Sequence, residues 1–143
     1  MHAISSEYKI KAKDFISAGE GSIKIKNTLK SLGLNPDIIR AVSICAYESE
    51  MNVVMHGGEG ILSMTVDDTG IILEVKDDGP GIGDLTLALA EGYSTAQEVY
   101  REMGFGAGMG LPNIVRNSDY VEIYSKKDKG TYLIISFWMN QRV

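Results

Sequence analysis

Strict alternation of apolar and polar residues marks several short stretches of the chain as half-buried strands. The first alternating stretch precedes two helical patterns, and the later apolar runs come in pairs. Turn-forming residues at 67–70 and 126–130 separate the members of each pair and predict two hairpins. The expected strands are 7–12, 60–66, 71–76, 120–124 and 131–138.

A spacing of three to four between apolar residues predicts a helix after the first strand. Asp14 is a candidate N-cap for this helix, and the apolar pattern runs from Phe15 to Leu29. Gly33 is suited to end it in a left-handed conformation. We therefore expect the first helix to begin directly after Asp14 and to stop at Gly33.

A second helix is expected from Pro36, after the candidate cap Asn35, to the glycines at 57–58. Its inner stripe is apolar through Cys45 and, at the same spacing, continues with Glu48, Asn52 and His56. A carboxylate and an amide on a core-facing stripe are costly unless they serve a site, so Glu48 and Asn52 are candidates. The alternative is that both are solvated helix residues at a cleft edge, or that they cap a neighbouring loop. Cys45 and His56 are expected to be a small core residue and a helix-end residue.

Glu50 lies two positions beyond Glu48 on this helix. Two residues correspond to about 200° of rotation, so Glu50 is predicted to be exposed on the opposite side.

Glycines stand at every second position from Gly104 to Gly110, and a short helical pattern follows at 111–115. Such a loop exposes backbone N–H groups, and a helix N-terminus adds its positive dipole, which together favour phosphate. A flexible loop with a packing role is the alternative. The stretch lacks the lysine of a P-loop and has Gly-x-Gly-x-Gly in place of Gly-x-Gly-x-x-Gly.

A second glycine segment, 77–83, begins with an acidic residue at a strand end. Asp77 could accept a hydrogen bond from an exocyclic amine such as that of adenine, and Gly79 and Gly81 would admit a flat ring. A simple Asp-Gly turn is the alternative. The long connection between the two glycine segments, about 84–105, is expected to be a lid that includes a short helix at 85–90.

The order of these elements predicts the fold class: an α/β two-layer sandwich, with a mixed, mostly antiparallel sheet and helices on one face. A length of 143 residues suits one domain over 1–143. The net charge of −5, without a compact basic cluster, argues against nucleic acid as the main partner. No apolar run approaches the roughly 18 residues of a membrane span, and no leader pattern is visible. A single cysteine fits a reducing cytoplasm.

Taken together, the motifs resemble the GHKL, or Bergerat-fold, ATPases. Glu48-x-x-x-Asn52 is similar to the N box of that family, and Asp77-x-Gly79-x-Gly81 to its first glycine box. The second glycine box and the final strand turn of the family resemble 106–111 and 130–131. The four motifs occur in family order and cover essentially the whole chain.

The resemblance implies an ATP site in which Asn52 holds Mg²⁺, Glu48 is the catalytic base, and Asp77 and Thr131 recognise adenine. The implied ATP-binding residues are Asn52, Asp77, Gly79, Gly81, Ile82, Gly104, Gly106, Ala107, Gly108, Met109, Gly110, Leu111 and Thr131. Arg101, the one arginine of the expected lid, is assigned to the γ-phosphate.

The small size is similar to that of the anti-sigma-factor serine/threonine kinases, and 79–82, 91–95 and 106–112 resemble the stressosome switch-kinase branch. The sporulation branch carries an arginine where this chain has Gly106. The resemblance implies phosphorylation of a small STAS-domain antagonist, or binding of a sigma factor, with a homodimer left open. A histidine kinase catalytic domain and a non-catalytic, nucleotide-gated anti-sigma protein are the alternatives.

Overall fold

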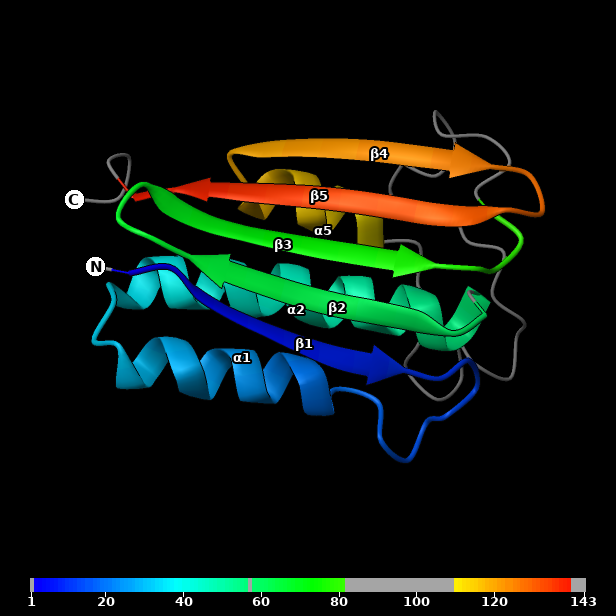
Figure 1. Ribbon diagram of the computed structural model, residues 1–143, viewed down its shortest axis with the longest axis horizontal. Helices are drawn as coiled ribbons and strands as arrows, with labels where there is room; N and C mark the ends of the chain where they lie inside the picture. The colour runs from blue at the N-terminus through cyan, green and yellow to red at the C-terminus, as the bar shows by residue number, and fades with distance from the viewer. Residues whose placement is uncertain (1, 57, 82–109, 140–143) are drawn as a thin grey trace.

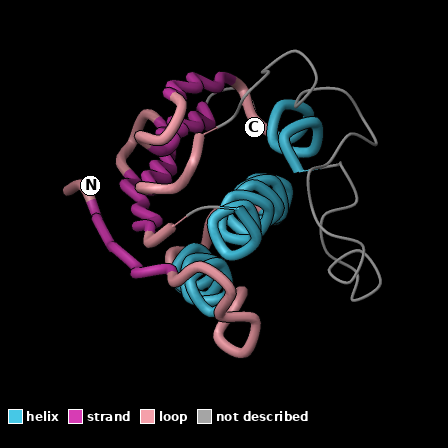
Figure 2. Tube along the Cα trace, turned by 90° about the vertical axis from the view of Figure 1, so that its right-hand side faces the viewer, coloured by secondary structure: helices cyan, strands magenta, loops and turns pink. Residues whose placement is uncertain are grey.

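The protein is a five-stranded antiparallel sheet with its described helices on one face (Figures 1 and 2). The computed structural model describes residues 2–56, 58–81 and 110–139. The strand order is β1-β2-β3-β5-β4, and all pairings among these strands are antiparallel. The predicted two-layer α/β sandwich is confirmed. The elements are β1 (Ile4–Ile10), α1 (Glu20–Ser31), α2 (Pro36–His56), β2 (Gly60–Val66), β3 (Gly70–Asp77), α5 (Gly110–Asn117), β4 (Tyr120–Lys126) and β5 (Gly130–Trp138).

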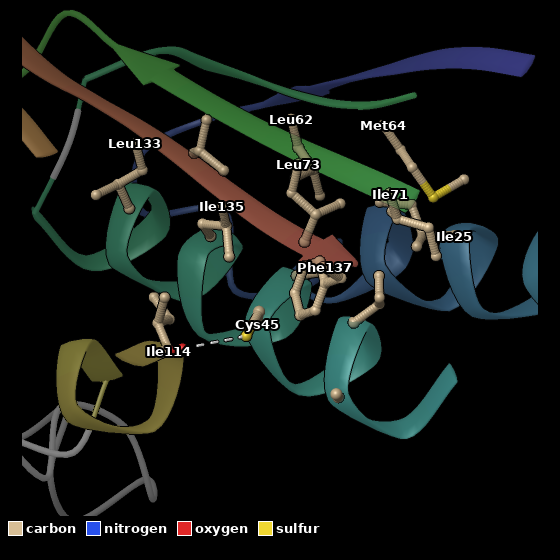
Figure 3. Close-up of a cluster of buried hydrophobic side chains, with 14 of the residues drawn as sticks. Ile25, Cys45, Leu62, Met64, Ile71, Leu73, Ile114, Leu133, Ile135 and Phe137 are labelled. Atoms are coloured by element: carbon tan, nitrogen blue, oxygen red, sulfur yellow. Dashed lines mark hydrogen bonds between the residues drawn. The ribbon is translucent and has the colours of Figure 1, made fainter. Parts of the chain in front are cut away.

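The core lies between the sheet and the helices (Figure 3). Alternate strand residues such as Leu73 and Phe137 are fully buried, because one face of each strand meets the helices. In the same layer, Cys45 of α2 donates its thiol hydrogen to the Ile114 carbonyl of α5, with an Sγ–O distance of 3.6 Å. Cys45 is therefore a small core residue, as expected, and it joins the two helices.

Helix α2 follows its predicted bounds, Pro36 to His56. The Asn35 side chain accepts the N–H of Asp37 at 2.7 Å, and this bond ties down the start of the helix. Burial, with a smaller contribution from nearby Lys13, holds the pKa of His56 below its ordinary value. Both predicted hairpins, β2–β3 and β4–β5, are present.

Helix α1 begins at Glu20, so the prediction that it begins directly after Asp14 is wrong. The Asp14 carboxylate caps a local turn, since it accepts the N–H of Ser17 at 3.2 Å. The residue before the helix, Gly19, has a φ of 94°, which a side chain would make costly. The chain therefore turns sharply at Gly19 before the helix begins, although the apolar spacing continues through the turn.

One row of strand residues crosses four strands at a single end of the sheet: Ile10, Gly60, Asp77 and Thr131 are successive partners. At this end Gly130 has a φ of 90°, and a Cβ on it would collide with the Asp77 carbonyl. The β4–β5 turn can therefore close only with glycine at this position. Asp77 and Thr131 end up side by side, facing the helix layer.

No helix in the described parts of the chain combines the length and the apolar character that crossing a bilayer requires. The predicted lid at 84–105, with its short helix, lies outside the described residues.

Candidate nucleotide and phosphate site

Glu48 and Asn52 lie one turn apart on α2 and both meet the first residue of α5. A Cβ built on Gly110 would lie 3.2 Å from Asn52 Oδ1 and 3.5 Å from Glu48 Oε2. The fold therefore brings the end of the second glycine segment against these two polar side chains. A helix N-terminus at this place adds positive dipole to a carboxylate and an amide.

The Glu48 carboxylate has one partner on the neighbouring helix, because Asn113 Nδ2 donates to Glu48 Oε1 at 3.2 Å. In turn, Arg116 donates to Asn113 Oδ1 at 2.8 Å. Burial raises the pKa of Glu48, and the Asn113 hydrogen bond opposes part of that rise. The motif comparison missed Asn113. Its position, three residues after Gly110, is the signal that places it on the same face of α5.

Asp77, at the end of β3, is half-buried and accepts backbone hydrogen bonds. The Gly79 N–H donates to Asp77 Oδ1 at 2.9 Å, and the Thr131 N–H also contributes. Burial raises the pKa of Asp77, while these two N–H groups lower it. The Thr131 hydroxyl lies 3.2 Å from Ser125 Oγ. A pocket of about 400 Å³ at this sheet end includes Asp77, Ser125 and Thr131 in its lining.

The two halves of the candidate site are joined through a glycine of β2. Val53, the residue after Asn52, packs against Gly60, where an added Cβ would lie 2.8 Å from Val53 Cγ1. Gly60 is the strand partner of Asp77. The polar end of α2 and the acidic end of β3 therefore occupy the same end of the molecule.

Glu50 is buried, so the prediction that it is exposed is wrong. Only 4% of its surface is accessible, and its carboxylate accepts three backbone N–H groups at the start of α1. The donors are Gly19 at 3.1 Å, Gly21 at 3.2 Å and Ser22 at 2.9 Å. Glu50 therefore caps α1 from a different helix, at the positive end of its dipole.

Of the predicted ATP-binding residues, seven are described. Besides those above, Gly81 has a φ of 80°, with Lys126 O only 2.5 Å from a Cβ built there, and Leu111 is buried in the core. The others, Ile82, Arg101, Gly104, Gly106, Ala107, Gly108 and Met109, lie outside the described residues.

The residues around Asn52 fit a metal ion that is held mainly by the phosphate oxygens of a bound nucleotide. Among the described residues, no group of three His, Cys, Asp or Glu side chains could hold a metal ion. Asn52 offers one hard carbonyl oxygen beside Gly110, where a backbone without a side chain leaves room. Mg²⁺ bound through one or two protein oxygens plus phosphate oxygens suits such a place.

A helix that begins at a glycine, the polar pair on α2 and the acidic end of β3 together indicate a nucleotide-binding protein. The comparison with family models agrees. Residues 40–141 match the family described as histidine kinase-, DNA gyrase B-, and HSP90-like ATPase, and the chain belongs to that family. The resemblance to the GHKL ATPases is therefore confirmed, and ATP is the nucleotide that the family implies.

Individual relatives are similar at modest identity. The "Anti-sigma F factor" of Clostridium perfringens is 29% identical over 87% of this chain and 91% of its own length. The "Serine/threonine-protein kinase RsbT" of Bacillus subtilis is 26% identical over 80% of this chain and 83% of its own. A solved histidine kinase domain from the Erythrobacter litoralis EL346 blue-light activated histidine kinase has a TM-score of 0.49 and 13% identity, covering 87% of this chain and 62% of that one.

Proposed function

We propose that the protein is an ATP-dependent serine/threonine kinase that phosphorylates a small STAS-domain antagonist protein in a partner-switching pathway. In this reaction the acceptor hydroxyl oxygen attacks the γ-phosphorus of ATP. The bond from that phosphorus to the bridging oxygen of ADP breaks, and the hydroxyl proton passes to Glu48. A cytoplasmic location, inferred from the single cysteine, belongs to the same proposal.

The observation that carries the proposal is the meeting of Glu48 and Asn52 at Gly110. A general base must lie within hydrogen-bond reach of the proton that it takes, and it works best when its pKa is near the working pH. Burial raises the pKa of Glu48 towards that range. The Asn113 donor fixes the carboxylate orientation and leaves Oε2 directed towards the start of α5.

Asn52 is the residue that we assign to Mg²⁺, through its side-chain oxygen. The ion supplies neutralisation of phosphate charge when it is bound. We expect Asn52→Ala to lose Mg²⁺-dependent tight binding of ATP and to retain adenosine binding, which titration calorimetry with and without Mg²⁺ measures. Identical titrations for wild type and variant would reject Asn52 as the ligand.

Adenine recognition is assigned to Asp77, with Thr131 and the first glycine segment beside it. The Asp77 carboxylate can accept an amine hydrogen while the Gly79 N–H occupies part of its capacity. Phosphate contacts are assigned to the second glycine segment at the start of α5, and a γ-phosphate contact to Arg101 of the lid. These assignments follow the family motifs.

A second function is favoured by the names of several relatives, which are anti-sigma F factors. Such a protein would bind a sigma factor under nucleotide control, and it would not need a base. The presence of Glu48 beside Asn52 and Gly110 favours catalysis, because a non-catalytic binder gains nothing from a half-buried carboxylate there.

The test is transfer of radiolabelled phosphate from ATP to purified STAS-domain and sigma-factor proteins of the source organism. Glu48→Gln should keep ATP affinity within a few-fold and lose transfer by about 10²–10⁴-fold. Asp37→Asn, an exposed carboxylate at the far end of the same helix, is the matched control and should leave transfer unchanged. Wild-type transfer by Glu48→Gln would remove the proposed base. Binding of a sigma factor without any transfer would favour the second function.

A further inference from the structure

Three large apolar side chains are exposed around the start of α1. The exposed fractions are 98% for Ile16, 59% for Ile23 and 42% for Tyr47. The Tyr47 ring, on α2, lies 3.8 Å from a Cβ built on Gly19. Ile23 lies one turn after Gly19, whose carbonyl accepts the Ile23 N–H. The three residues therefore gather where α1 meets α2.

The loop that displays Ile16 is held in place at both ends. At its start the Lys13 N–H donates to the Val54 carbonyl of α2 at 2.7 Å. At its end Glu50 fixes Gly19 through the bond to its N–H. The residues on either side, Phe15 and Ala18, pack against the core. The Ile16 side chain is therefore held in solvent by a loop whose backbone is fixed at both ends. An exposed apolar side chain on fixed backbone is typical of a binding surface.

This surface lies at the same end of the molecule as the candidate site. The loop leaves β1 after Ile10, which begins the row that leads through Gly60 to Asp77 (Figure 1). Tyr47 directly precedes Glu48 on α2. A protein bound at the start of α1 would therefore be beside the proposed base.

The charge of this segment is opposite to that of the chain. Residues 9–30 contain six lysines and two acidic residues, whereas the whole chain has a net charge of −5. On α1, Lys26 and Lys30 are exposed and follow Ile23 at helical spacing of three and seven, so the three residues share one face. An exposed apolar centre with a basic border is complementary to an acidic protein surface.

We propose that this α1 surface, formed by Ile16, Ile23, Lys26, Lys30 and Tyr47, docks an acidic face of the protein that receives the phosphoryl group. The inference rests on the proposed kinase function and adds the place and the chemistry of substrate recognition. Ile16 is the apolar anchor, and the lysines steer and orient the acidic partner.

The experiment uses the same purified STAS-domain and sigma-factor proteins as probes. Ile16→Asp should raise the KM for the phosphorylated probe by about tenfold or more, as expected for an anchor residue. At saturating probe, kcat and the ATP affinity should equal those of wild type. The double variant Lys26→Glu, Lys30→Glu should raise KM in the same direction, and its effect should shrink as salt increases.

Ile72→Asp is the matched control, since Ile72 is an exposed isoleucine (43%) on the face of the sheet opposite the described helices. It should leave KM unchanged. A KM unaltered by both α1-surface changes, or raised equally by Ile72→Asp, would overturn the docking surface while the kinase function stands. If wild type neither binds nor phosphorylates any probe, the proposed function fails first and the inference with it. Ile16-dependent pelleting with phosphatidylserine vesicles, without any change in KM, would assign the surface to a membrane.

Discussion

Asn113 Nδ2 donates to Glu48 Oε1 across 3.2 Å, from the first turns of α5 to the middle of α2. This bond favours the ionised carboxylate, whereas burial favours the protonated form and is the larger influence on its pKa. A side chain of the helix that follows the glycine segment thus offsets part of the effect of burial on the carboxylate to which we assign the proton transfer.

The first prediction is a shift in the pH dependence of phosphate transfer. Asn113→Ala removes the donor that lowers the Glu48 pKa, so that pKa should rise further. A base works only when it is ionised, and the acid limb of the kcat profile should therefore move to higher pH. Transfer assays from pH 5 to 9 measure the limb. If the acid limb does not move in a folded variant, Glu48 is not the group whose ionisation controls the rate of transfer.

The second prediction concerns stability. The folded state raises the pKa of Glu48 above its ordinary value of 4.5, so the folded protein binds this proton more tightly than the unfolded chain. The ionised side chain therefore destabilises the fold above the folded pKa, and the penalty disappears below pH 4.5. Glu48→Gln should raise Tm at pH 8 and leave it unchanged at pH 4, as thermal unfolding at both values will show. An equal effect at both values would contradict the raised pKa.

The third prediction tests nucleotide discrimination. Asp77→Asn loses a charged acceptor for the adenine amine, and a hydrogen bond to a charged group is worth roughly 1.5–3 kcal/mol. ATP affinity should fall much more than GTP affinity, which competitive calorimetry measures. Because the Gly79 and Thr131 N–H groups can still donate to the amide oxygen, the strand end should stay folded. Unchanged ATP affinity would remove the adenine assignment.

The fourth prediction concerns Glu50. Glu50→Gln keeps one acceptor oxygen for three buried N–H groups, and we expect a loss of about 1–3 kcal/mol in the free energy of unfolding. Glu50→Leu should cost more, because no acceptor remains. Glu20→Gln changes an exposed carboxylate in the first turn of α1, the helix that Glu50 caps. It should lower the free energy of unfolding by only a few tenths of the loss expected for Glu50→Gln. Denaturant unfolding gives all three values. Equal stability of wild type and Glu50→Gln would show that these bonds contribute nothing.

Local patterns were sufficient for most of the fold. Strands and the bounds of α2 follow from alternation, capping and helical spacing, which depend on residues close together in the chain. The start of α1 could not be found in this way. Its apolar spacing runs back to Phe15, but the chain turns at Gly19 because a carboxylate from another helix occupies that turn.

In the candidate site, too, some features follow from the local sequence and others depend on tertiary contacts. The change from apolar to polar along one stripe of α2 indicated Glu48 and Asn52, and the structure places both at Gly110. Helical geometry correctly separated Glu50 from that stripe, but the conclusion that it is exposed did not follow. A helix covered by α1 on one side and α5 on another has two buried flanks, and only the tertiary contacts show this.

The bonds to Glu50 also decide what the smallest folding unit is. The family match begins at residue 40, but the backbone N–H groups that donate to the buried Glu50 carboxylate lie at 19–22. A fragment trimmed to the matched region would retain the acid and lose its donors, together with β1 along one edge of the sheet. Expression of this domain therefore requires the segment before residue 40, because that segment supplies the hydrogen-bond donors of Glu50 and an edge strand of the sheet.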